Sequence, residues 1–176
     1  MPFTGLFEWM DALESSVALR QSINAYPFLL TLHLISMAAF AGLIGFWDMR
    51  LVGIALKTVP VSKITERIFP WMIAAFVVTL VSGFLLAYSK PLTYHENFYF
   101  WVKNALMILA GINAGVFHLT TEQTVTQWEN DPVTPRGAKI AGIASLAMWA
   151  VIIMTGRMIA YSALVPEWWV ALNAAE

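Results

Sequence analysis

The chain has 176 residues, of which 59% are hydrophobic and 12% are charged, and its mean hydropathy is +0.68. Soluble domains average about 45–50% apolar and about 25% charged residues, so the composition excludes an ordinary soluble domain and predicts an integral membrane protein. The net charge of −1 gives no reason to expect nucleic-acid binding, and the lack of cysteine excludes disulfides, thiolate metal sites and iron–sulfur clusters.

The first segment predicts an amphipathic helix over about residues 3–20. Its apolar side chains recur at helical spacing, at Phe3, Leu6, Phe7, Met10, Leu13 and Val17, while Glu8, Asp11 and Glu14 fall on another face. A helix of this kind lies at the bilayer surface or packs on a partner protein. The acidic residues and the lack of a basic start do not fit a signal peptide.

Four apolar segments follow, over about residues 27–47, 70–88, 99–119 and 140–161. Each has about the ~20 residues that a helix needs to cross a bilayer. Pro70 suits the first turn of the second helix and Thr134 suits an N-cap for the last one. Because short connections join antiparallel neighbours, we expect an all-α, up-and-down bundle of four transmembrane helices, forming one membrane domain over residues 1–176.

The basic residues are unevenly distributed between the two sides of the predicted bundle. Six of them fall in the connections 48–69 and 120–139, namely Arg50, Lys57, Lys63, Arg67, Arg136 and Lys139, and the other four are Arg20, Lys90, Lys103 and Arg157. Basic connections stay in the cytoplasm. The sequence therefore predicts a bacterial inner-membrane protein with both termini in the periplasm.

Few ionisable residues fall within the predicted spans, and such residues are functional candidates because they are costly in hydrocarbon. They are His33, Lys103, His118 and Arg157, and no Asp or Glu is expected in a span interior, which argues against an ion-coupled transporter. His33 can ligate haem iron or another metal, carry a proton, or bridge two helices. His118 lies about 18 Å deeper, so it cannot share one iron with His33 and would serve a second site or a structural role.

Arg157 falls at a depth similar to that of His33, near the end of the last span. Its guanidinium can extend to the lipid headgroups, or it can clamp a haem propionate or the headgroup of a lipid or quinone. Met154 and Met158 flank it and offer thioether sulfurs to an iron at His33. His95 lies in the connection after the second span, where a solvated histidine is favoured over a second axial ligand.

Gly111 and Gly115 form a GxxxG pair in the third span. Pairs of this kind usually allow close helix packing, and the same smooth surface could accept a flat porphyrin. Both interpretations predict that these glycines face another helix or a cofactor.

Five sequence runs resemble a small bacterial inner-membrane family of four-helix proteins defined only as a domain of unknown function. They are YPFLLTLHLISMAAFAG, GFWDMRLVGIAL, FPWMIAAFVVTLVSGFLLAYS, KNALMILAGINAGVFH and MTGRMIAY, within about residues 20–162. The matching marks are His33, Asp48, Arg50, His118 and Arg157. The family is distantly similar to the copper-resistance D membrane proteins and to four-helix b-type cytochromes. The resemblance implies the fold and, by architectural analogy, haem held by histidines.

The favoured hypothesis is therefore a membrane-integral b-type haem protein that transfers electrons or anchors a periplasmic redox complex, with no bond-making chemistry of its own. Haem b would be held by His33 and Arg157, with Met154, Met158 or His95 as second ligand and His118 at a second site. Membrane lipids, quinone, redox subunits or further copies of the chain would be its partners. The alternatives are a cofactor-free accessory subunit of a larger complex and a small transporter or metal-handling protein that uses His33 or His118.

Overall fold

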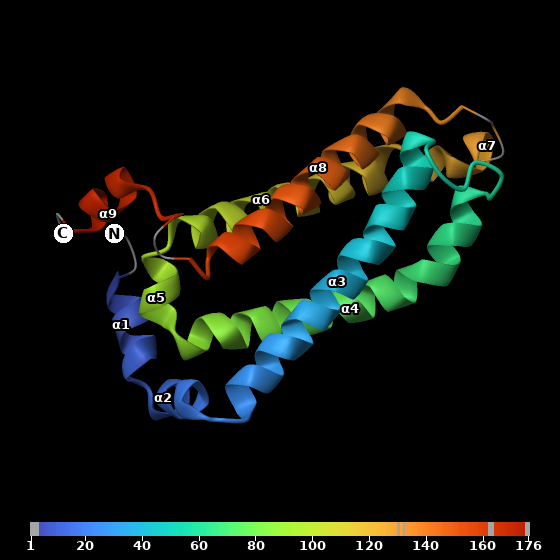
Figure 1. Ribbon diagram of the computed structural model, residues 1–176. Coiled ribbons are helices and arrows are strands. Elements are labelled where there is room, and N and C mark those ends of the chain that lie inside the picture. Colours follow the sequence, from blue (N-terminus) through green and yellow to red (C-terminus); the bar gives the residue numbers. More distant parts are fainter. Residues whose placement is uncertain (1–3, 130, 132, 162–163, 175–176) are drawn as a thin grey trace.

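The computed structural model describes residues 4–129, 131, 133–161 and 164–174 (Figure 1). In chain order its elements are α1 (Thr4–Ala12), α2 (Glu14–Gln21), α3 (Ala25–Val52), α4 (Val61–Ser89), α5 (Pro91–His95), α6 (Phe98–Thr120), the 3-10 helix η1 (Glu122–Thr124), α7 (Val125–Trp128), α8 (Arg136–Met158) and α9 (Glu167–Ala174). Every regular element among the described residues is a helix. Four of them, α3, α4, α6 and α8, are long and apolar enough to cross a membrane, which confirms the predicted four-helix membrane bundle.

The helices α3 and α4 run further than the predicted spans, so the connection between them covers only residues 53–60. Gly53 ends α3 in the left-handed conformation, with a φ of 83° that glycine adopts without steric cost. Pro70 therefore lies inside α4 and not in its first turn. The polar residues that indicated a long loop belong to helix ends, where tertiary contacts overcome their low hydropathy.

The four long helices are arranged as two pairs. α4 packs along α3, α6 packs along α8, and the two pairs are joined where α3 packs against α8. In Figure 1 the pairs lie close together at the end that carries α7 and diverge toward the end that carries α1, α5 and α9. We call these the loop end and the terminal end.

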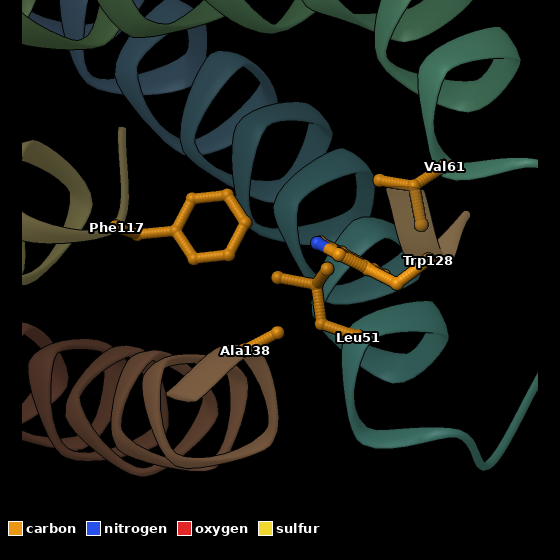
Figure 2. Close-up of a cluster of buried hydrophobic side chains, with 5 residues drawn as sticks. All are labelled: Leu51, Val61, Phe117, Trp128 and Ala138. Carbon is orange, nitrogen blue, oxygen red and sulfur yellow. The ribbon is translucent and has the colours of Figure 1, made fainter. Parts of the chain in front are cut away.

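The loop end is closed by a compact apolar core. Its buried side chains are Leu51, Val61, Phe117, Trp128 and Ala138, each from a different helix among α3, α4, α6, α7 and α8 (Figure 2). Gly142 of α8 lies directly on α3, because a Cβ added there would be 3.1 Å from the carbonyl oxygen of Asp48. This core holds both helix pairs together at the loop end.

The terminal end is covered by the N-terminal segment, which forms two helices where one had been expected over residues 3–20. Residues 1–3 lie outside the described residues, and Leu13 adopts an extended conformation that separates α1 from α2. α1 packs on α5, while α2 packs on α3 and α4, where the buried Ser16 donates a hydrogen bond to the carbonyl oxygen of Tyr88. The segment is thus docked on the bundle, and its contact with the bilayer surface stays a prediction.

Candidate ligand-binding site

A cavity of about 200 Å³ lies between the four long helices on the terminal side of the loop-end core. Five aromatic side chains line it, namely Phe40, Phe76, Phe84, Phe100 and Trp149, together with Met37 and Met107. Its polar lining consists of His33, Thr79, Lys103 and Asn104. The cavity is therefore mainly apolar, with a few polar groups that could orient a ligand.

His33 is buried in the wall between α3 and α4, and its ring is held by hydrogen bonds. Its Nδ1 lies 3.1 Å from the carbonyl oxygen of Thr79 and 3.1 Å from the hydroxyl oxygen of Ser82. A carbonyl oxygen only accepts, so Nδ1 carries the hydrogen in the bond to Thr79. In the neutral imidazole this leaves Nε2 as a hydrogen-bond acceptor or a metal ligand.

Gly83 makes room for this histidine. A Cβ added at Gly83 would lie 3.3 Å from Nδ1 of the His33 ring and only 2.9 Å from Cε1, and the latter distance is shorter than packed atoms approach. Gly83 was not among the residues predicted for the site. Its spacing from Thr79 could have indicated its role, since residues three and four apart lie on one helix face. Thr79, Ser82 and Gly83 form a small, polar surface on which the His33 ring packs.

Lys103 of α6 supplies the positive charge of the cavity wall. Its Nζ lies 3.8 Å from the position of a Cβ at Gly156 and within electrostatic range of the His33 imidazole. Within the described part of the chain, Lys103 makes no ion pair and donates no hydrogen bond. Lys103 was predicted as an intramembrane charge but not as a site residue, because the direction of its side chain around the α6 axis depends on how α6 packs.

The cavity is not lined by Arg157, Met154 or Met158, the residues expected to share a site with His33. Arg157 is exposed and donates a 2.9 Å hydrogen bond to the hydroxyl of Tyr161. Met154 is exposed, and Met158 is half-buried. Their positions along α8 place them on faces that turn away from Trp149 and Ile152, which do reach the cavity.

The two other histidines are separate from His33. His118 is exposed in the last turn of α6, at the loop end. His95 lies in α5, where it is only 3% exposed and its ring centre is 4.4 Å from that of Phe7 and 5.8 Å from that of Trp101. The expectation of a solvated His95 is wrong because Phe7 of α1, remote in sequence, covers it. Among the described residues, no three His, Cys, Asp or Glu side chains are grouped as a metal site.

The GxxxG pair of α6 faces away from the other described helices. Gly111 and Gly115 are exposed, and a Cβ added at either would meet nothing within 4 Å. The expected close packing of a neighbouring helix is therefore not made within the described part of this chain.

At the loop end, Asp48 is 1% exposed and belongs to α3, one residue beyond the predicted span 27–47. Arg50, 2% exposed, donates hydrogen bonds to the carbonyl oxygens of Val59 at 2.8 Å and Glu129 at 3.1 Å, and to the hydroxyl of Thr134 at 3.4 Å. Thr134 thus receives Arg50 and is not the N-cap of α8, a position that Pro135 occupies. Arg50 ties both loop-end connections to α3.

Comparison with known proteins places this chain in a family. The sequence matches a family of unknown function, DUF6644, over residues 7–162. The chain belongs to the DUF6644 family. No curated protein and no solved structure matches it, so the distant similarity to copper-resistance D proteins and b-type cytochromes stays a prediction.

Proposed function

We propose that this DUF6644 protein binds an amphiphile of the bilayer, with the ligand's polar group in the cavity beside Lys103. The observation that carries the proposal is an ammonium group in an aromatic cavity, with no partner among the described residues. A charge removed from water without a partner is costly. An anionic or carbonyl oxygen on a ligand would compensate that cost.

The cavity opens toward lipid along α4. Phe84 and Leu80 line it and are also 66% and 49% exposed, and α4 and α6 are not packed along each other in the described chain. Its volume of about 200 Å³ is below the ~300–1,000 Å³ of sites that enclose drug-sized ligands. A headgroup would fit inside, and an apolar tail would pass Phe84 and Leu80 into the hydrocarbon.

Haem b is the second candidate, and a specific observation favours it. The hydrogen bond from His33 Nδ1 to a carbonyl oxygen orients Nε2 as in metal-ligating histidines, and Met37 and Met107 bring sulfurs to the same cavity. A porphyrin would need the two helix pairs to separate, and Arg157 lies outside the cavity. These points favour the smaller headgroup. An absorption spectrum decides, because a Soret band that is lost in His33→Ala would establish haem.

The position in the bacterial inner membrane with periplasmic termini also belongs to this proposal. Arg50 is buried and tied to carbonyl groups, so the positive surface of the loop end is made by the other basic residues there. The chain has no cysteine, so single cysteines can be introduced at Glu8 and at Lys57. We expect an impermeant maleimide to label the first in intact spheroplasts and the second only after lysis.

Native mass spectrometry of the protein released from membranes tests the binding. We expect an adduct of amphiphile mass on the wild-type chain, reduced by about tenfold in Lys103→Met, because the loss of a charge-assisted hydrogen bond costs roughly 1.5–3 kcal/mol. Lys90→Met is the matched control, since the ammonium of Lys90 lies 4.5 Å from the ring centre of Tyr26, and Lys90 does not line the cavity. Equal adducts in wild type and Lys103→Met, or equal losses in both variants, would contradict the proposal.

A further inference from the structure

We infer that the headgroup is a hydroxylated aromatic ring of the quinol class, with a ring hydroxyl donating to Nε2 of His33 and a ring oxygen accepting from Lys103. This inference rests on the proposed function and specifies its ligand. It concerns binding only.

His33 and Lys103 require different hydrogen-bonding groups of a ligand, because His33 needs a donor and Lys103 needs an acceptor. With Nδ1–H committed to the carbonyl oxygen of Thr79, the neutral ring of His33 offers Nε2 as an acceptor, whereas the ammonium of Lys103 only donates. A carboxylate or a sulfonate has acceptors alone and would leave Nε2 unpaired. A quinol hydroxyl can donate to His33, and an oxygen of the same ring can accept from Lys103, so one small planar group satisfies both.

The rest of the wall suits a planar ring. The ring centres of Phe40 and Phe76 are 5.3 Å apart, those of Phe40 and Trp149 are 4.8 Å apart, and all three rings line the cavity. Aromatic rings pack well against one another in tilted and edge-to-face arrangements at these separations. A cavity of about 200 Å³ accepts one such ring, and its isoprenoid or alkyl tail would leave past Phe84.

The arrangement also predicts a preference between redox states of the ligand. A quinone accepts from Lys103 but has no hydroxyl to donate to His33, so its ring would cover Nε2 and leave that nitrogen without a partner. Leaving a buried acceptor unpaired costs about 1–3 kcal/mol, which corresponds to about fivefold or more in affinity. The site should therefore bind a quinol more tightly than the corresponding quinone.

Binding of three probes to the full chain in phosphatidylcholine nanodiscs tests this inference. The probes are tritiated decyl-1,4-benzoquinol, kept reduced under anaerobic conditions, its quinone, and decanoic acid. We expect the quinol to bind at least about fivefold more tightly than the quinone. His33→Leu should abolish that ratio, and His33→Gln, whose amide oxygen accepts, should restore part of it. Lys103→Met should weaken both ring probes.

The control is Asn113→Leu, which removes a polar side chain of α6 that donates to the carbonyl oxygen of Ala141 and does not line the cavity. It should keep the ratio. Equal affinity for quinol and quinone in the wild type, or an unchanged ratio in a monodisperse His33→Leu, would overturn the inference. Lys103-dependent binding of decanoic acid alone would overturn the inference while supporting the proposed function, and no binding of any probe would overturn both.

Discussion

The loop end and the terminal end of this bundle use their inward-facing cationic side chains, Arg50 and Lys103, in opposite ways. At the loop end, the guanidinium of Arg50 reaches three acceptors, and five helices contribute to one apolar core. At the terminal end, the helix pairs diverge, and Lys103 and His33 turn unused donors and an unused acceptor toward a cavity. The bonded guanidinium of Arg50 fixes the fold in one place, and the open donors of Lys103 and the open acceptor of His33 are available to a ligand in the other.

The largest effect is expected at Arg50. Arg50→Ala would leave the part-buried carbonyl groups of Val59 and Glu129 without their donor and would lower the free energy of unfolding by about 2–6 kcal/mol, since each polar group left unsatisfied costs about 1–3 kcal/mol. Lys103→Met, at the terminal end, should change it by less than about 1 kcal/mol, because no protein partner is lost. Reversible unfolding in mixed micelles measures both. Equal stability of the two variants would remove the distinction between the ends.

The next effect concerns the seam between α3 and α8. Gly142→Ala would press a methyl group against the backbone of α3 at Asp48, which cannot yield as a side-chain tip can, and should cost about 1–3 kcal/mol in the same assay. Gly111→Ala is the matched control, since its methyl group meets open space on a helix that alanine favours. A Gly142→Ala protein as stable as Gly111→Ala would show that the seam is not closely packed.

Gly83→Ala should separate stability from binding at the terminal end. The added methyl group would displace the ring of His33 from its bonds to Thr79 and Ser82, so we expect the quinol preference to fall by about fivefold. Because the ring can move into the adjoining cavity, the free energy of unfolding should change by no more than about 1 kcal/mol. An unchanged ratio of quinol to quinone affinity would show that the preference does not depend on the hydrogen bonds of His33 to Thr79 and Ser82.

The smallest effect is expected at Asp48. One of its carboxyl oxygens, Oδ2, has no hydrogen-bond partner, and no described residue forms an ion pair with it. Asp48→Asn keeps the shape of the side chain, so we expect a change in unfolding free energy within about 1 kcal/mol. A loss as large as that of Arg50→Ala would reveal that the negative charge of Asp48 is needed at the loop end.

The four spanning helices can be predicted from the sequence, because each is recognisable by its hydropathy and its length. The ends of α3 and α4 cannot be predicted in this way, since Leu51 and Val61 there pack in one core with Trp128, a residue remote in sequence. The position of a residue along its helix can also be predicted, as for His33 in α3 and Arg157 in α8. The direction in which a side chain points around its helix axis cannot be predicted, because it depends on which helix packs against it. Arg157 is accordingly exposed outside the cavity, whereas Lys103 lines the cavity.

The central claim is that the cavity beside Lys103 receives a headgroup from the bilayer. Photo-crosslinking in native membranes, with an amphiphile that carries a diazirine on its hydroxylated ring, tests it most directly. Peptide mapping should place the adducts on cavity residues such as Phe100 and Trp149, with loss of these adducts in Lys103→Met and not in Lys90→Met. Adducts confined to lipid-facing residues such as Ile35 and Met154, equal in both variants, would contradict the account.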